Sequence, residues 1–246
     1  MRKNSIVSDS LLWILILVAV LMPIRASSAS VPPEMGAAIF GSRFNLSANE
    51  TAAESAIAAY IRAAFAGQNY DARNWYGGYT TVSTVLAAAQ GLGYNYDTLF
   101  HIGHGGYWNW YWLIGYTVHY YYLDDSGEWV KDCDVYAQTT SGCYYFVFIW
   151  SCYQGDVIGG DDSHTAAVGM PYAWLHTNAL SSDGYATPDS GSRCFIGFKH
   201  FAPQLTNDFL GNGAMSNFLQ SFYSNAVTSH FIINTSLDNA ALHVWG

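Results

Sequence analysis

The sequence predicts an α/β domain in which a mostly parallel sheet is covered by helices on both faces. Segments with the pattern of buried strands alternate along the chain with segments of helical pattern, as in proteins built on a parallel sheet. Of the 246 residues, 51% are hydrophobic and only 11% are charged, which suits one substantial core. No internal repeat, linker or low-complexity tract interrupts the sequence. One domain over residues 30–246 is therefore expected.

The first residues, 1–29, predict a secretory signal peptide. Arg2 and Lys3 precede the apolar stretch LLWILILVAVLMPI, and small residues follow it, with cleavage expected near Ala29. An uncleaved anchor is the alternative, although this apolar stretch is short against the roughly 20 residues that a membrane span needs. We expect a secreted or cell-surface protein with no membrane contact beyond this segment.

The first strands and helix of the domain have clear signals. The apolar segment MGAAIFGS at 35–42 predicts a short buried strand. A capping-box pattern from Ser47 to Glu50 then opens an Ala-rich helix that ends at Gly67. The segment NYDARNWYGG at 69–78 can hold a second short strand.

The middle of the chain predicts a helix, a strand and a hairpin. The helix at 80–93 opens on threonine and closes on glycines. The segment YDTLFHIGHGG at 96–106 predicts a strand that also ends in glycines. Residues 107–142 are rich in aromatic and β-branched side chains and carry an Asp-Ser-Gly turn at 125–127, so they predict hairpin strands.

The last part of the chain supplies two further strands and a helix. YYFVFIW at 144–150 predicts a buried strand, and SGSRCFIGFKHF at 190–201 predicts another one. MSNFLQSFYSNAVT at 215–228 predicts an amphipathic helix. Since the strands alternate with helices, we expect most of them to run parallel and to end at one edge of the sheet.

The four cysteines all lie in the part that is expected to be exported, where disulfides persist. Cys133 and Cys143 bracket a turn-rich segment, and their separation suits a bridged hairpin. Four cysteines allow three full pairings. We favour a single bridge, Cys133–Cys143, which leaves Cys152 and Cys194 free. Two bridges with no reactive thiol are the alternative.

Two expected strands deliver chemically active side chains to the same edge. LFHIGHGG ends on His104, followed by Gly105, and the strand at 144–150 ends on Ser151 and Cys152. In open α/β sheets this edge is where ligands bind. An imidazole beside a thiol produces a sulfur nucleophile at neutral pH. The N–H groups of Gly105 and Cys152 are placed to stabilise a tetrahedral oxyanion.

These two blocks resemble the caspase–gingipain–legumain superfamily, the clan CD cysteine peptidases. A hydrophobic strand ending in His-Gly, about fifty residues before a second strand ending in a small residue plus Cys, is typical of that superfamily. The pair Ser151-Cys152, with Gly155 three positions after the cysteine, looks closest to the legumain-like branch. The resemblance implies a caspase-like three-layer sandwich with a hairpin insertion after the His strand. It also implies His104 as general base, Cys152 as nucleophile, and the Gly105 and Cys152 amides as the oxyanion hole.

The resemblance leads us to expect a secreted cysteine endopeptidase that hydrolyses peptide bonds through a Cys-His dyad and a thioester acyl-enzyme. The candidate substrate-pocket residues are Trp150, Ser151 and Asp156. Asp156, with Asp161 and Asp162, could attract a basic side chain or form a solvated or calcium-binding loop. The partner is a peptide or protein, because a net charge of −9 argues against nucleic acid.

The alternative function is a non-catalytic extracellular module that binds sugars or a protein partner through the aromatic segment 107–122. No cofactor is expected. His101 and His104 form an H-x-x-H pattern, but on a strand residues three apart face opposite sides, so they do not chelate one zinc. The other histidines, His119 among them, show no metal-ligand spacing, and no metal site is expected.

Overall fold

The computed structural model describes residues 35–91, 96–112, 115–139, 144–157, 169–176, 193–205 and 213–246. Residues Pro33–Gly246 form one compact unit. The predicted signal peptide lies outside the described residues. Within the described ranges, no helix combines the length and the apolar character that crossing a membrane requires.

The central element is a five-stranded sheet in the order β2-β1-β3-β7-β8. Every neighbouring pair is parallel. Because both faces of such a sheet are covered, inner strands such as GAAIFG in β1 and FVFIW in β7 are continuous apolar runs. The strands are β1 (Gly36–Gly41), β2 (Asp71–Trp75), β3 (Tyr96–Ile102), β7 (Phe146–Trp150) and β8 (Cys194–Ile196).

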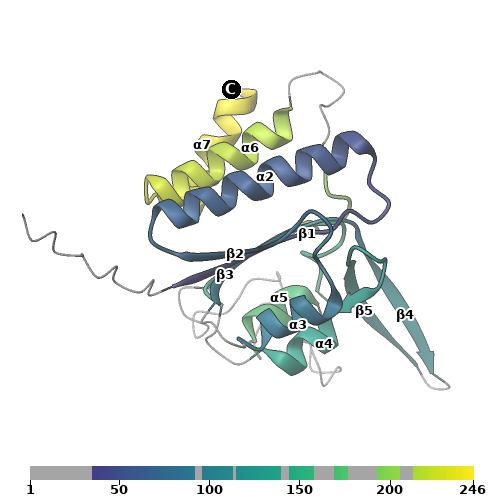
Figure 1. Cartoon of the computed structure of the whole chain (residues 1–246). Coiled ribbons are helices and arrows are strands. Elements are labelled where there is room, and N and C mark those ends of the chain that lie inside the picture. The colour runs from purple at the N-terminus through teal and green to yellow at the C-terminus, as the bar shows by residue number, and fades with distance from the viewer. Residues whose placement is uncertain are drawn as a thin grey trace, which may run out of the picture. The chain divides into compact units, whose positions relative to one another are not determined.

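Helices cover both faces of this sheet (Figure 1). One layer consists of α2 (Ala48–Gly67), α6 (Ala214–Tyr223) and α7 (Ile233–Trp245), with the π-helical turn η2 (Ser224–Thr228) after α6. The other layer contains α3 (Val82–Ala89), α4 (Asp132–Gln138) and α5 (Met170–Leu175).

Successive residues of the central strands supply two separate cores. In β1, Ala37 and Ile39 pack in the core under α2 and α6, whereas Ala38 and Phe40 pack in the core that includes α3 and α5. The predicted fold class, an α/β sandwich of three layers with a parallel sheet, is confirmed.

The hairpin expected after the His strand is also present. Strands β4 (Gly105–Trp112), β5 (Gly115–Leu123) and β6 (Trp129–Lys131) form a second, antiparallel sheet. Alternate β5 residues, Tyr120 and Tyr122, are fully buried in the α3–α5 core. These two rings of the aromatic segment therefore pack in the core.

Three local predictions need correction. The segment after Cys133 does not form a hairpin, because residues to Gln138 lie in helix α4, in whose first turn Asp132 Oδ1 accepts the Cys133 N–H at 2.8 Å. The single helix expected at 215–228 ends at Tyr223 and continues as a π-helical turn. Helices α5 and α7 were not predicted at all.

Candidate functional site

The two predicted catalytic residues extend from neighbouring parallel strands. Ile102 of β3 pairs with Trp150 of β7, and the Gly103 N–H donates to the Trp150 carbonyl oxygen at 3.2 Å. His104 and Cys152 each lie two residues beyond this matched pair. Their positions along the sheet are therefore equal, and both reach its carboxyl edge.

His104 and Cys152 line one cavity of 460 Å³. It lies on the α2 side of the sheet edge, and Gly105 and Trp150 line it as well. The remaining walls come from α2 and from the segment 201–205. The structure thus brings four of the residues selected from the sequence into one site.

The Cys152 side chain is half-buried and is held by a tight reversal of the chain. Its Sγ accepts a hydrogen bond from the Ala202 N–H at 3.3 Å, and its carbonyl oxygen accepts one from Gln154 Nε2 at 2.8 Å. Tyr153 has a left-handed φ of 64°, which is strained for an aromatic residue and is fixed by its N–H donating to the His200 carbonyl at 2.7 Å. The hydrogen bond from Ala202 holds the thiol beside the wall segment 201–205.

The N–H of Gly105 is not used in the hydrogen-bond ladder between β4 and β5. The Leu123 N–H donates to the His104 carbonyl at 2.9 Å, which makes His104 and Leu123 a hydrogen-bonded pair of the antiparallel ladder. The next pair, Gly105 with Tyr122, is then of the non-hydrogen-bonded type, so the Gly105 N–H points away from β5.

Only glycine fits at position 105. An added Cβ would clash with the Ser151 hydroxyl and would lie 2.8 Å from Gln154 Nε2 and 2.9 Å from the Tyr121 carbonyl oxygen. The His-Gly pair and the Ser-Cys pair are consequently packed directly against one another.

The three candidate substrate-pocket residues have different positions. Trp150 lines the cavity, and its indole N–H donates to the Pro203 carbonyl at 2.8 Å, which positions the wall segment. Ser151 is fully buried beneath Gly105 and does not line the cavity. Asp156 also lies outside the lining, since its carboxylate accepts the Tyr120 hydroxyl at 2.9 Å. Asp161 and Asp162 lie outside the described residues.

Two acidic residues of α2 line the cavity and were not selected from the sequence. Glu50 and Glu54 are one helical turn apart and face the same side. Glu54 is fully buried, and its Oε1 has no hydrogen-bond partner within the described part of the chain. Its Oε2 accepts the Ser55 hydroxyl at 2.7 Å and lies 3.5 Å from Arg43 Nε. Burial raises the pKa of the Glu54 carboxyl.

His101 is on the opposite face of the sheet from His104, as the strand period predicted. It is fully buried, its ring lies 4.1 Å from the Tyr122 ring, and neither ring nitrogen has a partner among the described residues. Burial lowers the pKa of His101 to about 3. His101 is therefore a neutral core residue at physiological pH.

None of the described cysteines, Cys133, Cys152 and Cys194, is joined to another described cysteine. Burial raises the pKa of the Cys194 thiol to about 11, which makes it a poor nucleophile. Cys143 lies outside the described residues, so the bridge between Cys133 and Cys143 stays a prediction.

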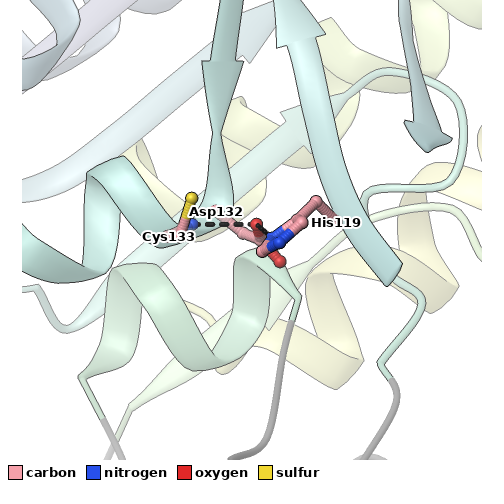
Figure 2. A group of neighbouring side chains, drawn as sticks. All are labelled: His119, Asp132 and Cys133. Atoms are coloured by element: carbon pink, nitrogen blue, oxygen red, sulfur yellow. Dashed lines mark hydrogen bonds and ion pairs between the residues drawn. The ribbon is translucent and has the colours of Figure 1, made fainter. Parts of the chain in front are cut away.

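A second group of side chains lies outside this cavity. His119 of β5 approaches Asp132 and Cys133 at the start of α4 (Figure 2). The His119 Nδ1 is 3.2 Å from Asp132 Oδ1, and the three ligand-type atoms are within 4.8 Å of one another. No sequence pattern indicates this group, because a strand residue and a helix residue 13 positions apart follow no single period.

No protein-family model matches the chain, and no curated protein is significantly similar to it. Function therefore has to be inferred from the residues of the site.

Proposed function

We propose that the chain is a secreted cysteine endopeptidase that uses a Cys152–His104 dyad. One observation carries this proposal: a thiol and an imidazole from adjacent parallel strand ends line the same cavity. The resemblance of the two sequence blocks to clan CD peptidases points in the same direction. Export by residues 1–29 is part of the proposal.

The chemistry follows from the roles of these groups. Cys152, as the thiolate, attacks the peptide carbonyl carbon, and the resulting oxyanion accepts hydrogen bonds from the Gly105 and Cys152 N–H groups. His104 gives the proton it took from the thiol to the leaving amine. A thioester remains on Cys152, and water, deprotonated by His104, hydrolyses it and restores the thiol.

The cavity favours a substrate side chain that is both long and positively charged. Its acidic lining residues are Glu50 and Glu54, and its apolar walls include Trp150 and Leu205, which suit the methylene stem of a lysine or arginine. Glu50 is the more exposed of the two carboxylates, whereas Glu54 is fully buried and lies 3.5 Å from Arg43 Nε, so Glu50 is the carboxylate that a cation can reach directly. We therefore propose cleavage after basic residues.

Aromatic rings beside the cavity can hold the peptide on either side of the scissile bond. Tyr153 lies 5.0 Å from the Tyr107 ring and 5.4 Å from the Phe201 ring, and both of these neighbours are exposed. The alternative, a binding module built on the aromatic segment, has less support, since Tyr120 and Tyr122 are fully buried in the core.

The proposal is tested by digesting a mixed peptide library with the mature, reduced protein and identifying the cut sites by mass spectrometry. Cuts after arginine or lysine that disappear with Cys152→Ala support it. Cleavage that persists in Cys152→Ala would show that another group carries the activity.

A further inference from the structure

The group of His119, Asp132 and Cys133 lies between the three-stranded sheet and helix α4, outside the candidate catalytic cavity (Figure 2). It combines an imidazole, a carboxylate and a thiol. Asp132 is almost fully buried, His119 is partly buried and Cys133 is exposed, so the group is anchored on one side and open to solvent on the other.

The spacing of these atoms is close to that of ligands on one zinc ion. With zinc bonds of roughly 2.0–2.3 Å and tetrahedral angles, a nitrogen and an oxygen ligand lie roughly 3.4 Å apart. His119 Nδ1 and Asp132 Oδ1 are 3.2 Å apart. The Cys133 sulfur, within 4.8 Å of both, reaches bonding range by rotation of an exposed side chain.

Negative charge exceeds positive charge on the chain around Cys133, where Asp132 and Asp134 are accompanied by one lysine, Lys131. The Cys133 thiol lies 3.8 Å from Asp134 Oδ1 and directly follows Asp132 in the chain. A divalent cation would stabilise the thiolate and both carboxylates at once.

The carboxylate is already oriented by backbone donors. Asp132 Oδ1 accepts the Cys133 N–H at 2.8 Å, and Oδ2 accepts the Gly169 N–H at 2.9 Å. Donors of this kind fix ligating carboxylates in metal sites. The contact with Gly169 also connects the group to the start of α5.

We propose that His119, Asp132 and Cys133 form a zinc site that fixes the β4–β5–β6 sheet to the α4–α5 layer. The sulfur, nitrogen and oxygen donors favour zinc over calcium or magnesium, which prefer oxygen ligands. Binding releases the thiol proton and leaves the His119 ring proton on Nε2.

The test uses the reduced, chelator-treated mature chain with Cys152→Ala, which removes the other accessible thiol near a histidine. Zinc alone is titrated by calorimetry, and cobalt alone is followed by its sulfur-to-metal charge-transfer absorption. We expect one ion per chain and a rise in melting temperature with zinc. Cys133→Ser should abolish the cobalt–sulfur band and weaken zinc binding by roughly tenfold or more, whereas the matched control Cys194→Ala should bind as before.

His119→Gln provides a second variant and should also weaken zinc binding. The proposal is overturned if the reduced protein binds no zinc, or if zinc binding survives unchanged in Cys133→Ser. It is equally overturned if mapping of the secreted protein finds Cys133 joined to Cys143. None of these outcomes depends on peptidase activity.

Discussion

Acidification from pH 7 to pH 5 should destabilise the fold through His101. Its pKa falls from 6.5 to about 3 on folding because burial disfavours the charged ring. A histidine with a lowered pKa in the folded state contributes stability above its unfolded pKa, and this stability is lost as the pH falls from 6.5 toward 3. With 1.36 kcal/mol for each pKa unit, the loss between pH 7 and pH 5 is about 2 kcal/mol.

This loss of about 2 kcal/mol depends little on how far the pKa of His101 is lowered, because any folded-state pKa below about 4 leaves the ring neutral at pH 5. The assay is denaturant unfolding at both pH values, in the wild type and in His101→Leu, a substitution of similar volume that cannot be protonated. Other titrating groups affect both proteins equally, so the difference between their pH-dependent losses isolates His101.

We expect the wild type to lose about 2 kcal/mol more than His101→Leu between pH 7 and pH 5. Equal losses in the two proteins would contradict the reasoning, since they would mean that His101 is solvated or partnered in the folded state. The burial of His101 on the face of the sheet opposite to the cavity would then need revision.

The remaining predictions concern the site. Cys152→Ala should abolish peptide hydrolysis, and His104→Ala should lower kcat by roughly 10²–10⁴-fold, as measured with a fluorogenic peptide. Gly105→Ala should cost about 1–3 kcal/mol in chemical denaturation, whereas Gly67→Ala, whose Cβ meets no atom within 4 Å, should leave stability unchanged or slightly higher. Glu50→Gln should lower kcat/KM roughly 10-fold to 100-fold for substrates cleaved after arginine or lysine and change it less for neutral ones, and equal losses for both would remove Glu50 from substrate selection.

The positions of His104 and Cys152 could be predicted because parallel strands impose strong local constraints. An apolar run with glycines or a polar turn at its end fixes where a buried strand stops, and neighbouring parallel strands stop at the same edge. Because Ile102 pairs with Trp150, the two strands end side by side, and the residues that follow them lie in one site.

The acidic cavity wall could not be predicted in this way. Glu50 was recognised only as the capping residue of α2, a role that the structure confirms through its carboxylate accepting the Ser47 N–H at 2.9 Å. That Glu50 and Glu54 face the cavity depends on how α2 lies across the sheet, which no local pattern specifies. The sequence did contain one signal for this wall: Glu50 and Glu54 lie one helical turn apart at the start of the helix that follows β1.

Helix α4 was missed for a related reason. Its short sequence has little helical pattern, and its start is held by a long-range contact in which Asp132 accepts the N–H of Gly169, 37 residues away. Tertiary contacts decide such segments more than propensity does.

The central claim is that Cys152 is an activated nucleophile served by His104. The most direct measurement treats the reduced mature protein with irreversible thiol-directed peptidyl probes that carry basic, acidic or apolar residues next to the reactive group, followed by peptide mapping. We predict one adduct per chain, on Cys152, fastest with the basic probe and strongly slowed in His104→Ala. Failure of every probe to modify Cys152, while a small alkylating reagent does modify it in the folded protein, would contradict the claim.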